Sequence, residues 1–402
     1  MSLTTQTLNH KALMRIAYVM AFIQFTNALE YMALTPVFAF MADGFSVPVS
    51  FSGYVSGMYT LGAVISGSAA FYWIHLFNKK QFLLKNMALL GALTFLSTLT
   101  THFEILLALR FFAGLVGGTT MGVGMSILIN HAPANLRGKI LATVIASFSM
   151  VSIVGMPAIL FLCTHYGWHT ALWLISSLCL VSLPLIVFTL PGDTVSSGVK
   201  TSLSINPQTV LFASCTALVQ FSPMLIIPIL TPLMTQYMGA QQTLLPMLFL
   251  SGGVAGYLST KITGMLTLRL SALMLATIST LFFVSSLLIP AMGYHNVFLF
   301  ITLFLGASYS RLVAASSVAI QFPEDEQRAN FSSLQTAIMF LLTTLAFFLS
   351  SLLLPDQGLT TQNLNRLLVV SAFAAGGFPV MVIMLQKKLA QRIRESDHPV
   401  VE

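Results

Sequence analysis

Apolar runs of membrane-spanning length recur along this 402-residue chain. A helix needs about 20 apolar residues to cross the hydrocarbon core of a bilayer. Twelve segments meet that length, and they begin near Leu13, Ser50, Phe82, Glu104, Ile140, Ala171, Thr209, Leu244, Leu270, Val297, Ser332 and Arg366. Charged residues make up only 7% of the chain, against about 25% in ordinary globular domains. The sequence therefore predicts an all-α membrane protein with twelve transmembrane helices.

The basic residues are distributed unevenly between the two sets of connections. All Lys and Arg except Arg110, Arg311 and Arg366 fall at or beside the connections on one side. Because cytoplasmic loops carry an excess of Lys and Arg, we expect this side, with both termini, to be cytoplasmic. The net charge of +7 then reflects orientation in a membrane and does not indicate a nucleic-acid partner. We expect a multi-pass protein of the cell inner membrane, in contact with membrane lipid.

One connection, from Gly192 to Pro207, is the longest on the cytoplasmic side and is rich in Ser, Thr and Gly, which is typical of a boundary. The predicted organisation is an N-terminal six-helix half over 1–191, a linker over 192–207, a C-terminal six-helix half over 208–386 and a cytoplasmic tail over 387–402. A weak internal repeat supports it, since Pro133 and Pro323 lie in similar stretches after the fourth and tenth segments. Two such halves are a known plan of secondary transporters, with the binding site near the midplane between them.

A carboxylate, Glu30, lies in the middle of the first apolar run. At about 100° per residue, Gln24, Asn27 and Tyr31 share a helical face with it. A charge in hydrocarbon is costly unless it is paired, neutralised or beside water, so Glu30 is a candidate functional residue. It is either a proton carrier that is exposed alternately to the two sides, or a carboxylate permanently paired with Arg110 that holds two helices together. We favour the proton carrier.

Two arginines, Arg110 and Arg311, also lie inside apolar segments. With a rise of about 1.5 Å per residue, Arg110 can share a level with Glu30, as either a proton-relay partner or a structural brace. Arg311 lies nearer the cytoplasmic side, on a face with Ser308. A guanidinium stays charged and forks onto carboxylates or phosphates, so Arg311 is a candidate for substrate recognition. The alternative for Arg311 is hydrogen bonding to serines or carbonyls of neighbouring helices.

The seventh segment carries Gln220 and then three prolines, Pro223, Pro228 and Pro232, which bend or locally unwind a helix. Two buried arginines against one glutamate favour an anionic or polar substrate over a cation. The predicted substrate-binding residues are Gln24, Asn27, Tyr31, Gln220 and Arg311, and the predicted proton-coupling residues are Glu30 and Arg110.

Four stretches resemble motifs of the major facilitator superfamily, and the resemblance covers nearly the whole chain. LALRFFAGLVGG, from Leu107 to Gly118, resembles the fourth-helix motif of an arginine followed by spaced glycines. FYWIHLFNKKQFLL, from Phe71 to Leu84, resembles the loop motif between the second and third helices. Its basic pair is kept, but His75 stands where the family has an aspartate that helps latch the cytoplasmic ends of the two halves.

The other two stretches follow the fourth segment. NLRGK, from Asn135 to Lys139, resembles the turn into the fifth helix, and Val154 to Leu174 is similar to the glycine-proline stretch of the drug:proton antiporter branch, including its sugar-efflux members. The resemblance implies that the first, fourth, seventh and tenth helices line a central cavity. It also implies conformational roles for His75, Lys79, Lys80, Gly114, Gly118, Arg137, Gly155 and Pro157.

These patterns predict a monomeric secondary transporter that moves a small organic solute by alternating access. Proton-coupled efflux by antiport is favoured by the resemblance. One alternative is a proton-coupled importer of an organic anion, such as a carboxylate nutrient or siderophore, and another is a non-cycling sensor, suggested by His75. The sequence has no phosphate-binding Gly-rich loop, no metal-ligand spacing and no nucleophilic constellation. We therefore expect no enzymatic activity, no cofactor and no metal.

Overall fold

The computed structural model describes residues 10–73, 77–131, 144, 147, 149–191, 206–323, 328–354 and 360–397, and every regular element in these ranges is a helix. The chain divides into two compact units, Met1–Val199 and Lys200–Glu402. Nine helical segments within the described ranges are long and apolar enough to cross a membrane. The prediction of an all-α membrane protein is confirmed.

Three of the twelve predicted spans are not among these nine. α2 (Ser52–Trp73) is a helix rich in Gly and Ser, and α3 (Lys79–Leu96) carries three lysines near its start, so both are less apolar. The segment predicted near Ile140 falls largely outside the described residues. Its described end is a π-helix, Val151–Gly155, followed by α6 (Met156–Tyr166), and together they form a shorter apolar helix.

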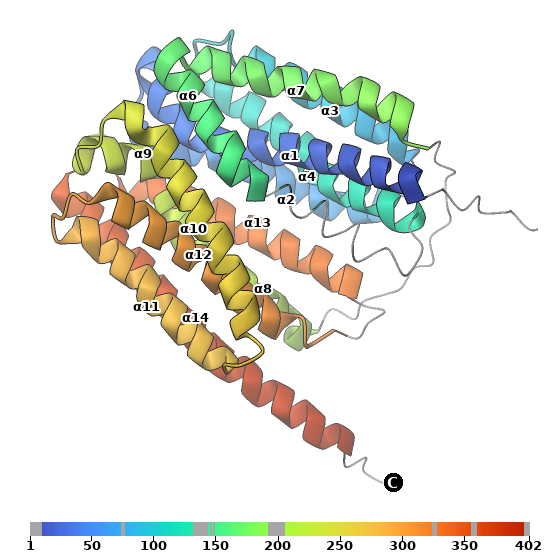
Figure 1. Ribbon diagram of the computed structural model, residues 1–402, viewed down its shortest axis with the longest axis vertical. Coiled ribbons are helices and arrows are strands. Elements are labelled where there is room, and N and C mark those ends of the chain that lie inside the picture. Colours follow the sequence, from blue (N-terminus) through green and yellow to red (C-terminus); the bar gives the residue numbers. More distant parts are fainter. Residues whose placement is uncertain are drawn as a thin grey trace, which may run out of the picture. The chain divides into compact units, whose positions relative to one another are not determined.

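The first unit contains α1 (His10–Met41), α2, α3, α4 (Phe103–His131), α6 and α7 (Trp168–Thr189). α1 packs on α2, α4, α6 and α7, and α3 packs on α4 and α7, an arrangement that can be followed in Figure 1. α6 and α7 are separated by Gly167, whose φ of 87° is a left-handed conformation that suits glycine. α1 therefore lies at the centre of the contacts within this unit.

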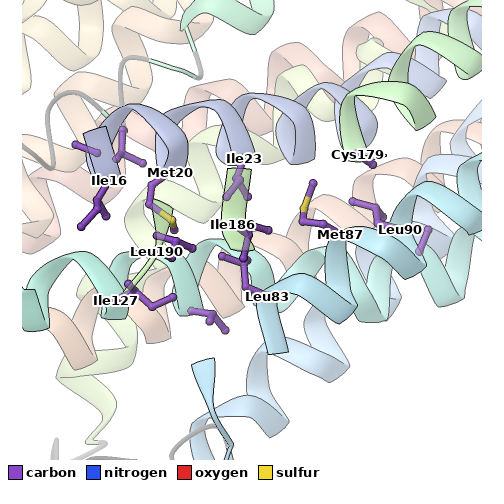
Figure 2. Close-up of a cluster of buried hydrophobic side chains, with 14 of the residues drawn as sticks. Ile16, Met20, Ile23, Leu83, Met87, Leu90, Ile127, Cys179, Ile186 and Leu190 are labelled. Carbon is purple, nitrogen blue, oxygen red and sulfur yellow. The ribbon is translucent and has the colours of Figure 1, made fainter. Parts of the chain in front are cut away.

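A hydrophobic core joins α1, α3, α4 and α7. Figure 2 shows side chains of these helices, among them Met20, Met87, Ile127 and Ile186, gathered in one cluster. Met20 and Met87 are both fully buried. Because lipid is as apolar as leucine, such a cluster holds helices together by van der Waals packing and not by transfer from water.

α2 and α4 come into backbone contact through glycines. A Cβ on Gly114 would overlap the backbone of Tyr59, and a Cβ on Gly62 would overlap the backbone of Phe111. Gly118 lies against the Cα of Ala63 in the same way. Small residues allow such an approach between membrane helices, and this is the close approach that the spaced glycines of the fourth segment predict.

The second unit begins with a broken helix. α8 (Pro207–Ile226) passes into a 3-10 turn (Ile227–Ile229), α9 (Leu230–Pro232) and a π-helix (Leu233–Tyr237). Proline removes a backbone hydrogen bond and clashes with the preceding turn. The predicted unwinding of this segment is therefore present after Pro223.

The rest of the second unit consists of longer helices, namely α10 (Leu245–Leu266), α11 (Ala272–Ala291), α12 (Val297–Ala319), α13 (Arg328–Leu353) and α14 (Thr361–Asp397). α12 packs on α10, α11 and α8, and α14 packs on α8 and α11. Asparagine or serine side chains cap the starts of α8, α11 and α12, as N-cap residues do. Residues 387–397 of the predicted tail continue α14, whose last turns extend past the end of α11 in Figure 1.

Candidate functional site

Polar side chains of α1 meet α4 along a line that we call the polar seam, made of Gln24, Asn27 and Glu30 on α1 and Arg110, Gly117 and Thr120 on α4. Gln24 Nε2 donates a hydrogen bond to the carbonyl of Thr120 (3.4 Å), and Asn27 Nδ2 donates to the carbonyl of Gly117 (3.3 Å). A step of three residues forward on α1 thus matches a step of three residues back on α4, as expected for antiparallel helices.

The seam ends in a buried ion pair. Arg110 Nη1 donates to Glu30 Oε1 at 2.5 Å, and Thr94 Oγ1 of α3 donates to the same oxygen at 3.2 Å. Arg110 Nη2 donates to Ser97 Oγ at 2.9 Å. Glu30 and Arg110 are each 1% exposed. Within the described ranges this is the only ion pair between side chains.

Several polar atoms of the seam lack a partner. Gln24 Oε1, Asn27 Oδ1, Glu30 Oε2 and Arg110 Nε are buried and form no hydrogen bond of normal geometry in the described part of the chain. The phenol of Tyr59 on α2 lies close enough to the Glu30 carboxylate to share a hydrogen bond with it, and it lies within electrostatic range of Arg110. Glu30 therefore uses one oxygen for the ion pair and keeps the other for a further donor or a proton.

Tyr31 is the fourth residue of the helical face predicted to contain Gln24, Asn27 and Glu30. It lies on the side of α1 that faces α2. Its ring stacks on Tyr59 with 5.4 Å between centroids. Gly117 makes room for this pair, because a Cβ there would overlap the Tyr59 hydroxyl and lie 3.1 Å from Asn27 Oδ1. The structure thus brings Gln24, Asn27, Tyr31, Glu30 and Arg110 into one region of the first unit.

Arg311 lies in the second unit and has a different environment. Nη1 donates to Ser222 Oγ of α8 (2.8 Å), and Nη2 donates to the carbonyl of Ala375 of α14 (3.3 Å). Its guanidinium carbon lies 4.6 Å from the ring centroid of Phe283 and 5.8 Å from that of Phe378. These bonds match the alternative interpretation of Arg311, in which it bonds to a serine and a carbonyl of neighbouring helices.

Hydrogen bonds around Arg311 and Ser222 also connect α14 to α8. Ser371 Oγ donates to the carbonyl of Ser222 at 2.8 Å, directly before Pro223. Arg311 is completely buried and no carboxylate of the described residues lies within ion-pair distance. Gln220, two residues before Ser222, is half-buried on α8.

The predicted conformational residues are partly described. Lys79 begins α3, and Lys80 Nζ donates to the carbonyls of Val187 (2.8 Å) and Leu190 (2.6 Å). Lys80 thus places its charge at the carboxyl end of α7, where a helix favours a cation. His75 and Arg137 lie outside the described residues.

The glycine-proline stretch lies against α1. Gly155 ends the π-helix and Pro157 is the second residue of α6. A Cβ on Gly155 would come within 2.8 Å of Leu29, the residue before Glu30. This stretch therefore contacts α1 one residue away from the member of the ion pair that α1 carries.

Sequence reasoning missed the uncharged partners of the buried charges. Thr94, Ser97, Tyr59 and Ser222 are hydroxyl residues in apolar segments, where hydroxyls commonly bond to their own helix. Thr94 and Ser97 do so too, with the carbonyls of Leu90 and Leu93. Their type and spacing alone therefore carry little information. Among the described residues no group of His, Cys, Asp and Glu could hold a metal ion.

Comparison with known proteins gives one family. A family model described as the Major Facilitator Superfamily matches residues 20–341. A bacterial homolog of the human lysosomal transporter Spinster, solved in an inward-facing and occupied conformation, superposes with a TM-score of 0.76 at 13% identity, over 94% of this chain and 98% of that chain. At that identity the likeness shows the fold alone.

Two curated relatives have names that state a cargo. The "Probable sugar efflux transporter" of Mannheimia succiniciproducens is 26% identical over 46% of this chain and 47% of its own length. The "Niacin transporter NiaP" of Acinetobacter baylyi is 27% identical over 43% of this chain and 36% of its own length. The matched part of the chain thus spans less than half the length of either relative.

Proposed function

Because the chain belongs to the Major Facilitator Superfamily, we propose that it is a secondary transporter that exports a small organic solute in exchange for protons. It crosses the inner membrane twelve times as a monomer, with both termini in the cytoplasm. The nine apolar helices and the superposition over 94% of the chain support this architecture. The name of the sugar efflux relative supports export.

The buried ion pair of Glu30 and Arg110 carries the proposal of proton coupling. Glu30 is the only acidic residue well inside an apolar segment, and embedded acids in membrane proteins are commonly part of proton relays. Its Oε2 forms no hydrogen bond of normal geometry in the described chain, and the nearby Tyr59 phenol can either donate to the carboxylate or accept from it once it is protonated.

Protonation of Glu30 changes the balance of charge in the first unit. The neutral acid leaves Arg110 as a buried cation held only by hydrogen bonds, and an uncompensated buried charge is strongly destabilising. Arg110 then gains from another anion, from a polar solute or from water. Proton binding and the arrangement of α1 against α4 are therefore linked, which is what coupling requires.

A second candidate function is proton-coupled import of an organic anion. The observation that favours it is Arg311, a buried cation without a carboxylate partner among the described residues. A guanidinium in that state is suited to a carboxylate, and niacin, the cargo in the name of one relative, is a carboxylic acid. In this case Arg311 is the recognition residue, with Gln220 of the same unit as a further contact. The third possibility, a sensor that does not cycle, predicts ligand-dependent conformational change without net flux.

Transport in proteoliposomes with an imposed inward proton gradient separates these functions. Lactose, arabinose, niacin and 4-hydroxybenzoate, which is named in two further relatives, are offered in turn, and interior pH and solute are read together. We expect one of the solutes to leave as protons enter, and Glu30→Gln to abolish this coupling while solute exchange at equal pH persists. Entry of a carboxylate together with protons would establish import, and unchanged coupling in Glu30→Gln would remove Glu30 from the mechanism.

A further inference from the structure

The polar seam holds three successive oxygen atoms that accept no hydrogen bond of normal geometry from the described chain. They are Gln24 Oε1, Asn27 Oδ1 and Glu30 Oε2, and all three atoms are buried. The amide nitrogens of Gln24 and Asn27 are already used, since they donate to carbonyls of α4. Buried polar atoms that the protein leaves unpaired are usually satisfied by ordered water.

The spacing of these oxygens suits water. The three residues follow each other at intervals of three, so neighbouring members are about 4.5 Å apart along α1 and the outer two are about 9 Å apart. One water that donates to two acceptors at about 2.8 Å each spans a gap of that shorter length. Residues spread over the longer distance along one helix present their oxygens in a row, so a chain of waters fits better than one ion.

Glycines of α4 border the seam at both amides. At Gly117 a Cβ would overlap the Tyr59 hydroxyl and crowd Asn27 Oδ1, and at Gly124 it would overlap Met20 Cε and lie 3.0 Å from Gln24 Nε2. Side chains at either position would press on the polar atoms of α1. The Tyr59 hydroxyl, which can both donate and accept, thus borders the seam beside Asn27.

We propose that the polar seam binds a short chain of water molecules that runs from Gln24 past Asn27 and Tyr59 to Glu30 Oε2. The water site stands on the geometry of α1 and α4 alone. Its use as a route along which a proton reaches Glu30 rests on the proposed function. At the Gln24 end the seam meets the hydrophobic core, because Met20, next to Gly124, belongs to that cluster.

X-ray radiolytic labelling of the full-length protein in proteoliposomes tests the water site. Bound water near a side chain yields hydroxyl radicals that oxidise it even when it is buried. Met20 and Tyr59 border the seam and are 0% and 4% exposed. Met87, equally buried in the hydrophobic core of α3, is the matched control. We expect Met20 and Tyr59 to be oxidised several-fold faster than Met87, and equal rates would overturn the inference.

Variants show whether the labelling depends on the seam. Asn27→Leu removes the central acceptor and should lower the oxidation of Tyr59 several-fold, and Gln24→Leu should do the same for Met20. Thr26→Val is the control on α1, because Thr26 bonds only to Phe22 of its own helix. Unchanged slow oxidation of the buried Met87 reports that each variant is folded, and the exposed Met292 normalises the radical dose. Fast labelling that neither variant lowers would mean access from bulk solvent and would also overturn the inference.

The two proposals fail in different ways. If the seam is dry while Glu30→Gln still abolishes proton-coupled transport, the water chain is wrong and the role of Glu30 stands. If the seam is wet while Glu30→Gln transports as before, the water site stands and the coupling is wrong.

Discussion

The two units contain equivalent helix contacts, but they surround their buried arginines with different partners. α4 packs on α2 in the first unit, and α12 packs on α10 in the second. Arg110 comes four residues before Gly114, whereas Arg311 comes five residues after Gly306. Arg110 faces a carboxylate and a serine, while Arg311 faces a serine, a carbonyl and two aromatic rings. The first arrangement contains an acid, Glu30, and the second has no acid among the described residues.

This difference bears on where coupling and recognition lie. A carboxylate paired with Arg110 can hold a net neutral site that a proton unbalances. A guanidinium held by neutral groups keeps its positive charge and has no anionic partner among the described residues. This contrast supports the proposal of proton coupling in the first unit and, under the second candidate function, of recognition of a negative group in the second unit.

The largest effect is expected when the ion pair is broken from one side. Glu30→Ala leaves Arg110 as an unpaired buried cation, which should lower the free energy of unfolding by about 3–5 kcal/mol. Steric trapping in bicelles measures this quantity. The double variant Glu30→Leu, Arg110→Met has no buried charge left and should recover most of the loss. If the double variant is no more stable than Glu30→Ala, the unpaired charge of Arg110 is not the cause of the loss in the single variant.

Arg311 should depend on its hydroxyl partner. Ser222→Ala removes the acceptor of Nη1 and should cost about 1.5–3 kcal/mol, the range for hydrogen bonds to charged groups, in the same assay. Ser182→Ala is the matched control, because Ser182 is equally buried and bonds only to the carbonyl of Leu178 in its own helix. Equal losses in the two variants would mean that the bond from Arg311 adds nothing.

Gly114 of α4 and Gly306 of α12 lie at the equivalent helix contacts of the two units. Substitution by alanine should destabilise the protein more at Gly114 than at Gly306. Gly114→Ala forces a methyl group into the backbone of Tyr59, and such overpacking costs about 1–3 kcal/mol. At Gly306 the nearest atom is the side-chain Oγ of Ser259 at 3.0 Å, which can rotate away, so Gly306→Ala should cost less. Thermal unfolding in detergent ranks the two variants, with Gly122→Ala as a control that meets nothing within 4 Å. A Gly306→Ala loss as large as that of Gly114→Ala would contradict the ranking.

The sequence anticipates the features that rest on long periodic patterns. Runs of apolar residues predict the helices, and spaced glycines are typical of a close helix approach, although they do not say that α2 is the partner of α4. The similar depth of Glu30 and Arg110 in the membrane follows from the helical rise per residue, because the number of residues between each of them and the end of its helix can be counted in the sequence. The predicted unwinding after Pro223 follows in the same way from local chemistry.

The uncharged partners of the buried charges could not be predicted, because they depend on how helices are rotated against one another. Ser97 reaches Arg110 from α3, and Ser222 reaches Arg311 from α8. A hydroxyl residue in an apolar segment satisfies itself on its own helix whichever way it faces, so its position carries no mark of a distant partner. Aromatic partners such as Phe283 are equally hidden among the 31 phenylalanines of the chain.

The smallest effect concerns those aromatic rings. Phe283→Leu removes the face that lies 4.6 Å from the guanidinium of Arg311 and should cost about 0.5–2 kcal/mol beyond the loss of packing. Phe300→Leu supplies the packing term, because both rings are fully buried and both contact Phe304, at 5.5 and 5.6 Å between centroids. The excess cost of Phe283→Leu over Phe300→Leu should disappear in an Arg311→Met background. If the excess persists without Arg311, the ring acts by shape alone, and the second unit holds its buried arginine by Ser222 and Ala375 without help from aromatic charge distribution.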